Sequence, residues 1–115
     1  MNLQNVGETA WLQVTIRAWV AQTGTERPSP QTWADTIESS AVAVQDGVEP
    51  HFVGSFNALG VNQARWDLLR WGPRANEYHP AWAGAYGIVI WDVSGRDLYG
   101  RTFTGSGHTD VEPKG

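Results

Sequence analysis

The sequence contains no cysteine, and this absence excludes two classes of structure. Without thiols there is no disulfide framework and no thiolate metal site. Lysine is nearly absent as well, since it occurs once, at Lys114, and the formal net charge is −4. A chain without a run of Lys or Arg lacks the positive charge that holds a nucleic-acid backbone. We therefore do not expect nucleic acid as the partner.

Long apolar runs are missing too. No segment approaches the roughly 20 apolar residues that cross a bilayer, and the N-terminus, MNLQNVGETAW, lacks the basic start and apolar run of a signal peptide. We expect a soluble protein, intracellular or virion-associated, with no membrane partner. The length of 115 residues suits one domain with its own core, spanning 1–115. Residues 1–8 predict a polar arm, and residues 104–115 a Gly-rich tail that would be disordered in isolation.

Motifs for catalysis or metal binding are also lacking. His51, His79 and His108 are the only histidines, and their spacing matches no metal motif. No nucleophile motif of the hydrolase type is present. Gly105-Ser106-Gly107 lacks the Lys-Ser/Thr that would follow in a phosphate loop, so we interpret it as a flexible stretch. The sequence predicts no catalytic residue, no metal and no cofactor.

Tryptophan, by contrast, is abundant. Seven of the 115 residues are Trp, about fivefold the usual share. A buried indole needs a hydrogen-bond partner for its N–H, and one small domain cannot easily bury so many. We therefore expect some of them at an interface, where Trp is enriched. The alternative, that all seven belong to the core, stays open.

The first regular element is expected over 11–22, WLQVTIRAWVAQ. Apolar and polar residues alternate along it, and the β-branched content favours a strand. One side of this strand would carry Leu12, Val14, Ile16, Ala18 and Val20. A helix is the competing interpretation, because Leu12, Ile16 and Trp19 also fall at helical spacing.

Two helices are expected further along the chain. Ser29 followed by Pro30 is typical of a helix start, an apolar stripe follows, and Gly47 ends the pattern. The stripe, which we assign to the core, consists of Trp33, Ile37, Ala41 and Val44. An extended segment over 48–59 separates this helix from a second one over 62–71, with Asn62 as its cap and Gly72-Pro73 as its stop signal. Residues 73–84 are expected to be irregular.

The clearest pattern in the chain is 85–103, AYGIVIWDVSGRDLYGRTF. Two apolar, β-rich runs, 86–91 and 98–103, flank turn-like residues and predict a β-hairpin. A two-residue loop would place Asp92 opposite Asp97, a destabilising like-charge pair. A three-residue loop over 93–95 instead pairs Asp92 with Arg96 and Ile90 with Leu98, and we predict this register.

In that register both faces of the hairpin are apolar, so both require cover. One face would carry Tyr86, Ile88, Ile90 and Leu98, and the other Val89, Trp91, Tyr99 and Phe103. The predicted fold is α+β, a single small domain of mostly antiparallel sheet with a C-terminal β-hairpin and two helices.

The sequence thus favours a non-enzymatic structural or assembly protein, a homo-oligomer whose subunits meet through the aromatic-rich hairpin and the terminal arms. Connector and tail components of tailed bacteriophages share this design, although no motif matches them. The interface residues we predict are Trp82, Tyr86, Trp91, Tyr99 and Phe103. One alternative is a small-ligand protein with Tyr78 and His79 in its pocket and weak hydrolase or isomerase chemistry. Another is an acidic inhibitor or immunity-type protein.

Overall fold

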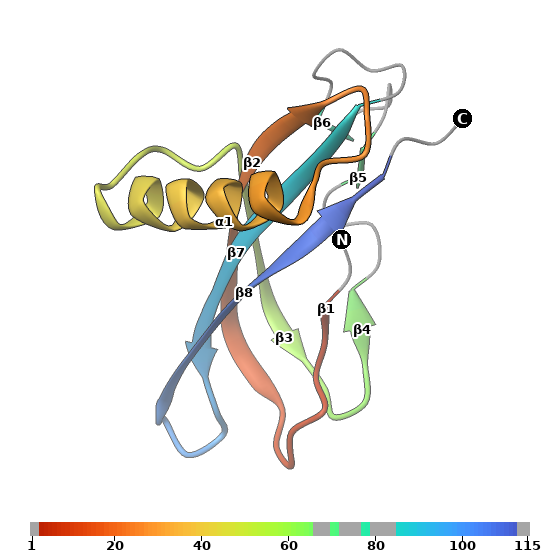
Figure 1. Cartoon of the computed structure of the whole chain (residues 1–115). Coiled ribbons are helices and arrows are strands. Elements are labelled where there is room, and N and C mark those ends of the chain that lie inside the picture. The colour runs from red at the N-terminus through yellow and green to blue at the C-terminus, as the bar shows by residue number, and fades with distance from the viewer. Residues whose placement is uncertain (1–2, 66–69, 72–76, 79–84, 113–115) are drawn as a thin grey trace.

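The computed structural model describes residues 3–65, 70–71, 77–78 and 85–112, and for 70–71 and 77–78 it describes the backbone alone. Four long strands form one antiparallel sheet in the order β3-β2-β7-β8. A single helix in the described residues, α1, lies across this sheet (Figure 1). Short strands pair as β1-β4, antiparallel, and β5-β6, parallel. The elements are β1 (Leu3–Gln4), β2 (Trp11–Gly24), α1 (Pro30–Gln45), β3 (Phe52–Leu59), β4 (Ala64–Arg65), β5 (Arg70–Trp71), β6 (Glu77–Tyr78), β7 (Tyr86–Arg96) and β8 (Thr102–Val111).

Strand β2, which its alternating sequence predicted as a strand, lies between β3 and β7 in the sheet. Its even-numbered residues from Val14 to Val20 are buried on one side of the sheet, which we call the core face. Val89 and Val93 of β7 lie directly opposite Val20 and Ile16 and are buried on the same face. The expected mostly antiparallel sheet in a small α+β domain is therefore confirmed.

The opposite side of the sheet, the helix face, is covered at one end by α1, which packs on β2 and β7. Trp19 and Ile88 lie there and are buried, and the Trp19 indole donates to the Val48 carbonyl at 2.6 Å. This bond meets the requirement of a buried indole for a partner. On the same face, beside Trp19, Arg17 and Asp92 are directly paired across β2 and β7, with Arg17 Nε 2.9 Å from Asp92 Oδ1.

The caps of α1 are those the sequence predicted. Ser29 is extended, and its Oγ accepts from the Thr32 N–H at 3.2 Å, with Pro30 beginning the helix. At the other end Gly47 takes φ 80°, and its N–H reaches the Val44 carbonyl while that of Val48 reaches the Ala43 carbonyl, a Schellman motif. The predicted stripe is less buried than a core stripe, because no residue of this fully described helix is buried and Ala41 is exposed.

The N-terminal arm is anchored by a buried asparagine. Asn5 is fully buried, and its Nδ2 donates to the carbonyls of Thr9 and Leu59 at 2.9 and 3.0 Å. Its Oδ1 accepts from the Gly7 N–H at 2.9 Å, and its backbone pairs with Asn62 and Gln63. The arm predicted as a polar extension therefore binds its own chain.

The helix predicted over 62–71 is wrong in the described part of that range. Asn62 has φ 63°, not the extended backbone of an N-cap, and the Gln63 N–H closes a turn on Gly60. Ala64 and Arg65 then pair with β1 as β4, and residues 70–71 form β5. Pairing with the N-terminal arm overrides the local helical pattern here.

The C-terminal hairpin exists, but its predicted register is wrong. Strand β7 runs through the expected turn to Arg96, and Asp97–Arg101 form the loop. Asp92 therefore lies opposite Ser106 and Ile90 opposite His108, so the predicted pairs Asp92–Arg96 and Ile90–Leu98 do not form. The predicted tail is likewise corrected, because its residues 104–111 continue β8.

Packing against glycine explains the register. A Cβ on Gly107 would lie 2.7 Å from the Trp91 ring, and one on Gly95 would lie 2.8 Å from the Phe103 ring. The hairpin thus places each aromatic side chain over a glycine of the facing strand. The alternative turn would lose both contacts.

Candidate interaction surface

The loop that joins β7 and β8 is exposed and closed by its own hydrogen bonds. It lies at the end of the sheet away from α1 (Figure 1). Asp97 holds it together: Oδ1 accepts from the N–H groups of Tyr99 and Arg101 at 2.9 and 3.0 Å, and Oδ2 accepts from Arg101 Nε at 2.9 Å. Two backbone bonds close the loop, from Asp97 N–H to the Arg101 carbonyl at 2.9 Å and from Gly100 N–H to the Asp97 carbonyl at 3.1 Å. Gly100 takes φ 80°, which favours glycine.

These five bonds fix the backbone of the loop, which presents two large apolar side chains to solvent. Leu98 is 62% exposed and Tyr99 75% exposed. The Arg101 guanidinium lies 5.4 Å from the centre of the Tyr99 ring, in cation–π geometry. We call Asp97–Arg101 the hairpin tip. A rigid loop that displays Leu, Tyr and Arg has the composition and the preorganisation of an interface anchor.

The charge of Asp97 is part of this organisation. Partial desolvation acts to raise the pKa of its carboxyl, but the hydrogen bonds from the Arg101 and Tyr99 N–H groups and from the Arg101 guanidinium outweigh it. The pKa of Asp97 therefore lies below its ordinary value. The tip holds a carboxylate rather than a carboxylic acid at neutral pH.

A groove of about 420 Å³ adjoins the tip at the end of the sheet. Its lining includes Leu12, Asn57 and Leu98, together with Gln13 and Arg96. Gln13 has φ 50° and lies at a β-bulge in β2, and its Oε1 accepts from Arg96 Nη2. Bulges of this kind redirect side chains at functional rims. The bulge and the tip together make this end of the sheet the best candidate for a contact surface.

The predicted interface residues do not all lie at this end. Trp91 and Phe103, which we predicted as interface residues, lie on the core face, and Phe103 packs against Trp11 with ring centres 5.0 Å apart. Tyr86 begins β7 at the far end of the strand, while Tyr99 belongs to the tip. Trp82 and His79 lie outside the described residues, and only the backbone of Tyr78, in β6, is described.

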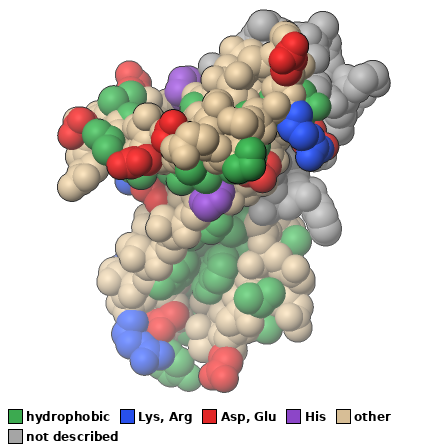
Figure 2. All heavy atoms as spheres, in the orientation of Figure 1, with side chains coloured by type: hydrophobic (Ala, Val, Ile, Leu, Met, Phe, Trp, Pro, Cys, Tyr) green, Lys and Arg blue, Asp and Glu red, His purple; other side chains and the backbone are tan. Residues whose placement is uncertain are grey.

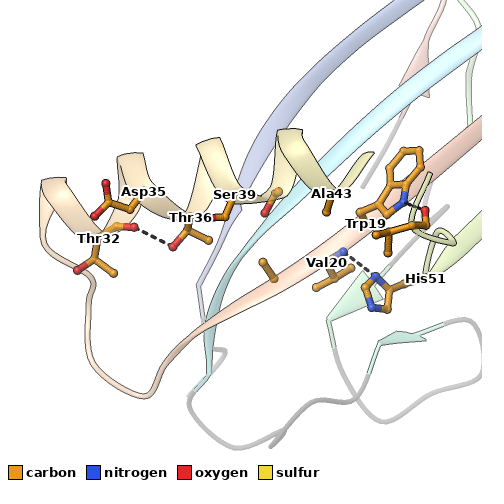
Figure 3. Close-up of a pocket in the computed structure, with 11 residues that line it drawn as sticks. Trp19, Val20, Thr32, Asp35, Thr36, Ser39, Ala43 and His51 are labelled. Atoms are coloured by element: carbon orange, nitrogen blue, oxygen red, sulfur yellow. Dashed lines mark hydrogen bonds between the residues drawn. The ribbon is translucent and has the colours of Figure 1, made fainter. Parts of the chain in front are cut away.

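A second groove, of about 400 Å³, opens beneath α1 (Figure 3). On one side it has hydroxyl side chains and one carboxylate of the helix, namely Thr32, Asp35, Thr36, Ser39 and Ser40. On the other it has Trp19 and His51, whose Nδ1 accepts from the Val20 N–H at 2.9 Å. Figure 3 shows Asp35 and His51 at opposite ends of the groove, so the two groups do not form an acid–base pair.

Figure 2 shows the same face as Figure 1, with hydrophobic side chains in the hollow below the helix. Acidic side chains lie along the helix and again near the opposite end of this face. In the described part of the chain, no three His, Asp or Glu side chains come close enough to hold a metal ion. No helix among the described residues is long and apolar enough to cross a membrane.

We compared the chain with protein-family models, with curated proteins and with solved structures, and it matches none of them.

Sequence reasoning named Tyr99 but missed the loop that presents it. Both Asp92-Val-Ser-Gly95 and Asp97-Leu-Tyr-Gly100 have the form Asp-x-x-Gly, a turn signal. The second turn is distinguished by its flanking residues. Trp91 and Gly107 lie equally far from it along the chain, and so do Gly95 and Phe103. Asn5 gave no signal of its own, because an asparagine in a polar arm usually faces water.

Proposed function

We propose that this chain is a non-enzymatic assembly subunit that associates with other copies of itself through the hairpin tip. The proposal depends on one observation, namely that the tip is ordered although its apolar side chains are exposed. Five hydrogen bonds order a loop whose two largest apolar side chains contact mainly water. Ordering a loop costs conformational entropy, and a preordered loop lowers the entropy cost of binding.

The rest of the described surface supports this proposal. Helix α1 buries no residue, and Val42 in it is 50% exposed. An amphipathic helix normally obtains its stability by burying its apolar face. Contact with a neighbouring subunit would supply that burial. A phage particle is one setting for such a subunit, and this setting stays a prediction from the sequence, as do the ligand-binding and inhibitor alternatives.

The test is a pair of substitutions at the tip, Leu98→Ser with Tyr99→Ser. Both side chains are exposed, so we expect the thermal midpoint of unfolding to change little. We expect the dissociation constant of the assembly to rise at least about tenfold, because hot-spot truncations cost 2 kcal/mol or more. Sedimentation velocity over a concentration series measures it.

Val53→Ser is the matched control, since Val53 is an apolar residue of similar exposure, 58%, on β3. Association that is lost equally in the control and the tip variant would point to a general effect of surface polarity. Association that is unchanged in the tip variant would contradict the tip as the contact.

A further inference from the structure

The outer edge of β8 is a second feature that the fold leaves open. Strand β8 is the last strand of the four-stranded sheet, and no described residue pairs with its outer side. It is 10 residues long. The other edge strand, β3, differs in that a backbone group at its end has a partner, because Asn5 donates to the Leu59 carbonyl.

Strand β8 also lacks the usual protections of an edge. Natural edges carry lysine, proline, inward charges or bulges that prevent another strand from pairing. From Thr102 to Thr109, TFTGSGHT, there is no Lys, Arg, Asp, Glu or Pro. Its register with β7 is continuous from Arg96–Thr102 to Gly87–Val111, without a bulge. Such an edge is a template for strand addition.

The charges that flank β8 identify the strand that would add. Arg101, whose Nε also binds Asp97, precedes it, whereas Asp110 and Glu112 lie at its end, where Glu112 also binds Arg27. In an antiparallel pair of two β8 strands, Arg101 of each copy approaches the acidic end of the other. A parallel pair would place like charges together, which is destabilising. The flanking charges therefore favour a second copy of the same strand in antiparallel orientation.

Resting on the proposed self-association, we infer that two copies of the chain pair antiparallel along β8, with Ser106 on the two-fold axis, to form one continuous eight-stranded sheet. This register keeps the core faces of the two sheets on the same side, because it pairs Thr104 with His108 and Phe103 with Thr109. It also centres the contact on Gly105, Ser106 and Gly107, where the side chains are smallest. A two-fold axis makes the contact self-complementary and closed.

A cysteine scan tests this inference. Because the chain has no cysteine, no other thiol can form a crosslink. In Ser106→Cys the two thiols would face each other across the axis. Residues directly opposite in antiparallel strands have Cα atoms about 4.5–5.5 Å apart, within the range that a disulfide spans. We expect mild oxidation to convert most of this variant to a covalent dimer. Ser55→Cys, exposed on the other edge strand, and Ser94→Cys, exposed on β7, are the matched controls and should stay monomeric under denaturing electrophoresis.

A second variant tests the contact without oxidation. Ser106→Lys places two ammonium groups together at the axis, and we expect the dissociation constant to rise at least tenfold. Ser94→Lys, on the same face of the interior strand, should leave it unchanged.

The outcomes separate this inference from the proposed function. An oligomer in which Ser106→Cys crosslinks no faster than the controls overturns β8 pairing and leaves self-association intact. A chain that is monomeric at all concentrations overturns both. Crosslinking at Ser106 that persists in the tip variant supports β8 pairing and contradicts the tip as an essential contact.

Discussion

At the residue scale, two residues, Asn5 and Gly107, fix how neighbouring segments of this fold pack. Asn5 uses its amide to satisfy two carbonyls and one N–H that the arm and the end of β3 would otherwise leave without partners. Gly107 provides the space that the Trp91 indole occupies. Asn5 thereby holds the N-terminal arm on the end of β3, and Gly107 fixes the register of β7 and β8, from which the tip projects.

Replacing Asn5 with alanine should destabilise the protein by about 2 to 4 kcal/mol, because buried groups left without hydrogen bonds cost roughly 1–3 kcal/mol each. Chemical denaturation measures the free energy of unfolding. Gln4→Ala, one residue away and exposed, is the control and should change it by less than about 0.5 kcal/mol. Equal effects of the two substitutions would show that the arm is not anchored by Asn5.

Gly107→Ala should destabilise the hairpin by about 1–3 kcal/mol, because overpacking at this scale forces a side chain off its rotamer. The new Cβ would lie 2.7 Å from the Trp91 ring, closer than real Cβ contacts. Gly105→Ala is the matched control on the same strand and face, where the Cβ would lie 3.3 Å from Val93 Cγ1, so the neighbour need move only slightly. If both variants unfold at the same denaturant concentration, the aromatic–glycine packing does not set the register.

At the scale of elements, local sequence patterns predicted β2 and α1 correctly but did not predict where the chain turns. The alternation from Val14 to Val20 and the caps at Ser29 and Gly47 act within a few residues, so the sequence alone predicts them. The hairpin turn had two equivalent Asp-x-x-Gly signals, and the choice between them depends on contacts between strands. The segment after Asn62 had a helical pattern that pairing with Leu3 and Gln4 overrides. The candidate site followed the same rule, since Tyr99 was identified and the Asp97 bonds that present it were not.

The hairpin tip should depend on the ionisation of Asp97. Its carboxyl has a lowered pKa in the folded chain, so the tip is stabilised at every pH above the ordinary value of about 3.9 and loses this stabilisation as the pH falls through the lowered pKa. A ¹³C NMR titration of the Asp97 carboxyl should therefore give a midpoint below the ordinary value. Arg101→Ala removes one of its donors and should raise that midpoint. A midpoint at or above the ordinary value would contradict the structure of the tip.

At the scale of the whole molecule, open surfaces lie on separate elements. The tip exposes Leu98 and Tyr99, α1 exposes Val42, and the outer edge of β8 has no strand beside it in the described residues. A subunit with two distinct contacts forms a ring or a longer array, whereas one with a single two-fold contact forms a dimer. The stoichiometry therefore indicates whether the tip and the edge act together.

The most direct measurement is the mass of the native particle, by sedimentation velocity and native mass spectrometry from low to high micromolar concentration. We expect a defined particle that contains an even number of 12.7 kDa chains, because the β8 contact pairs them. A single 12.7 kDa species at every concentration would contradict self-association as the function of this chain.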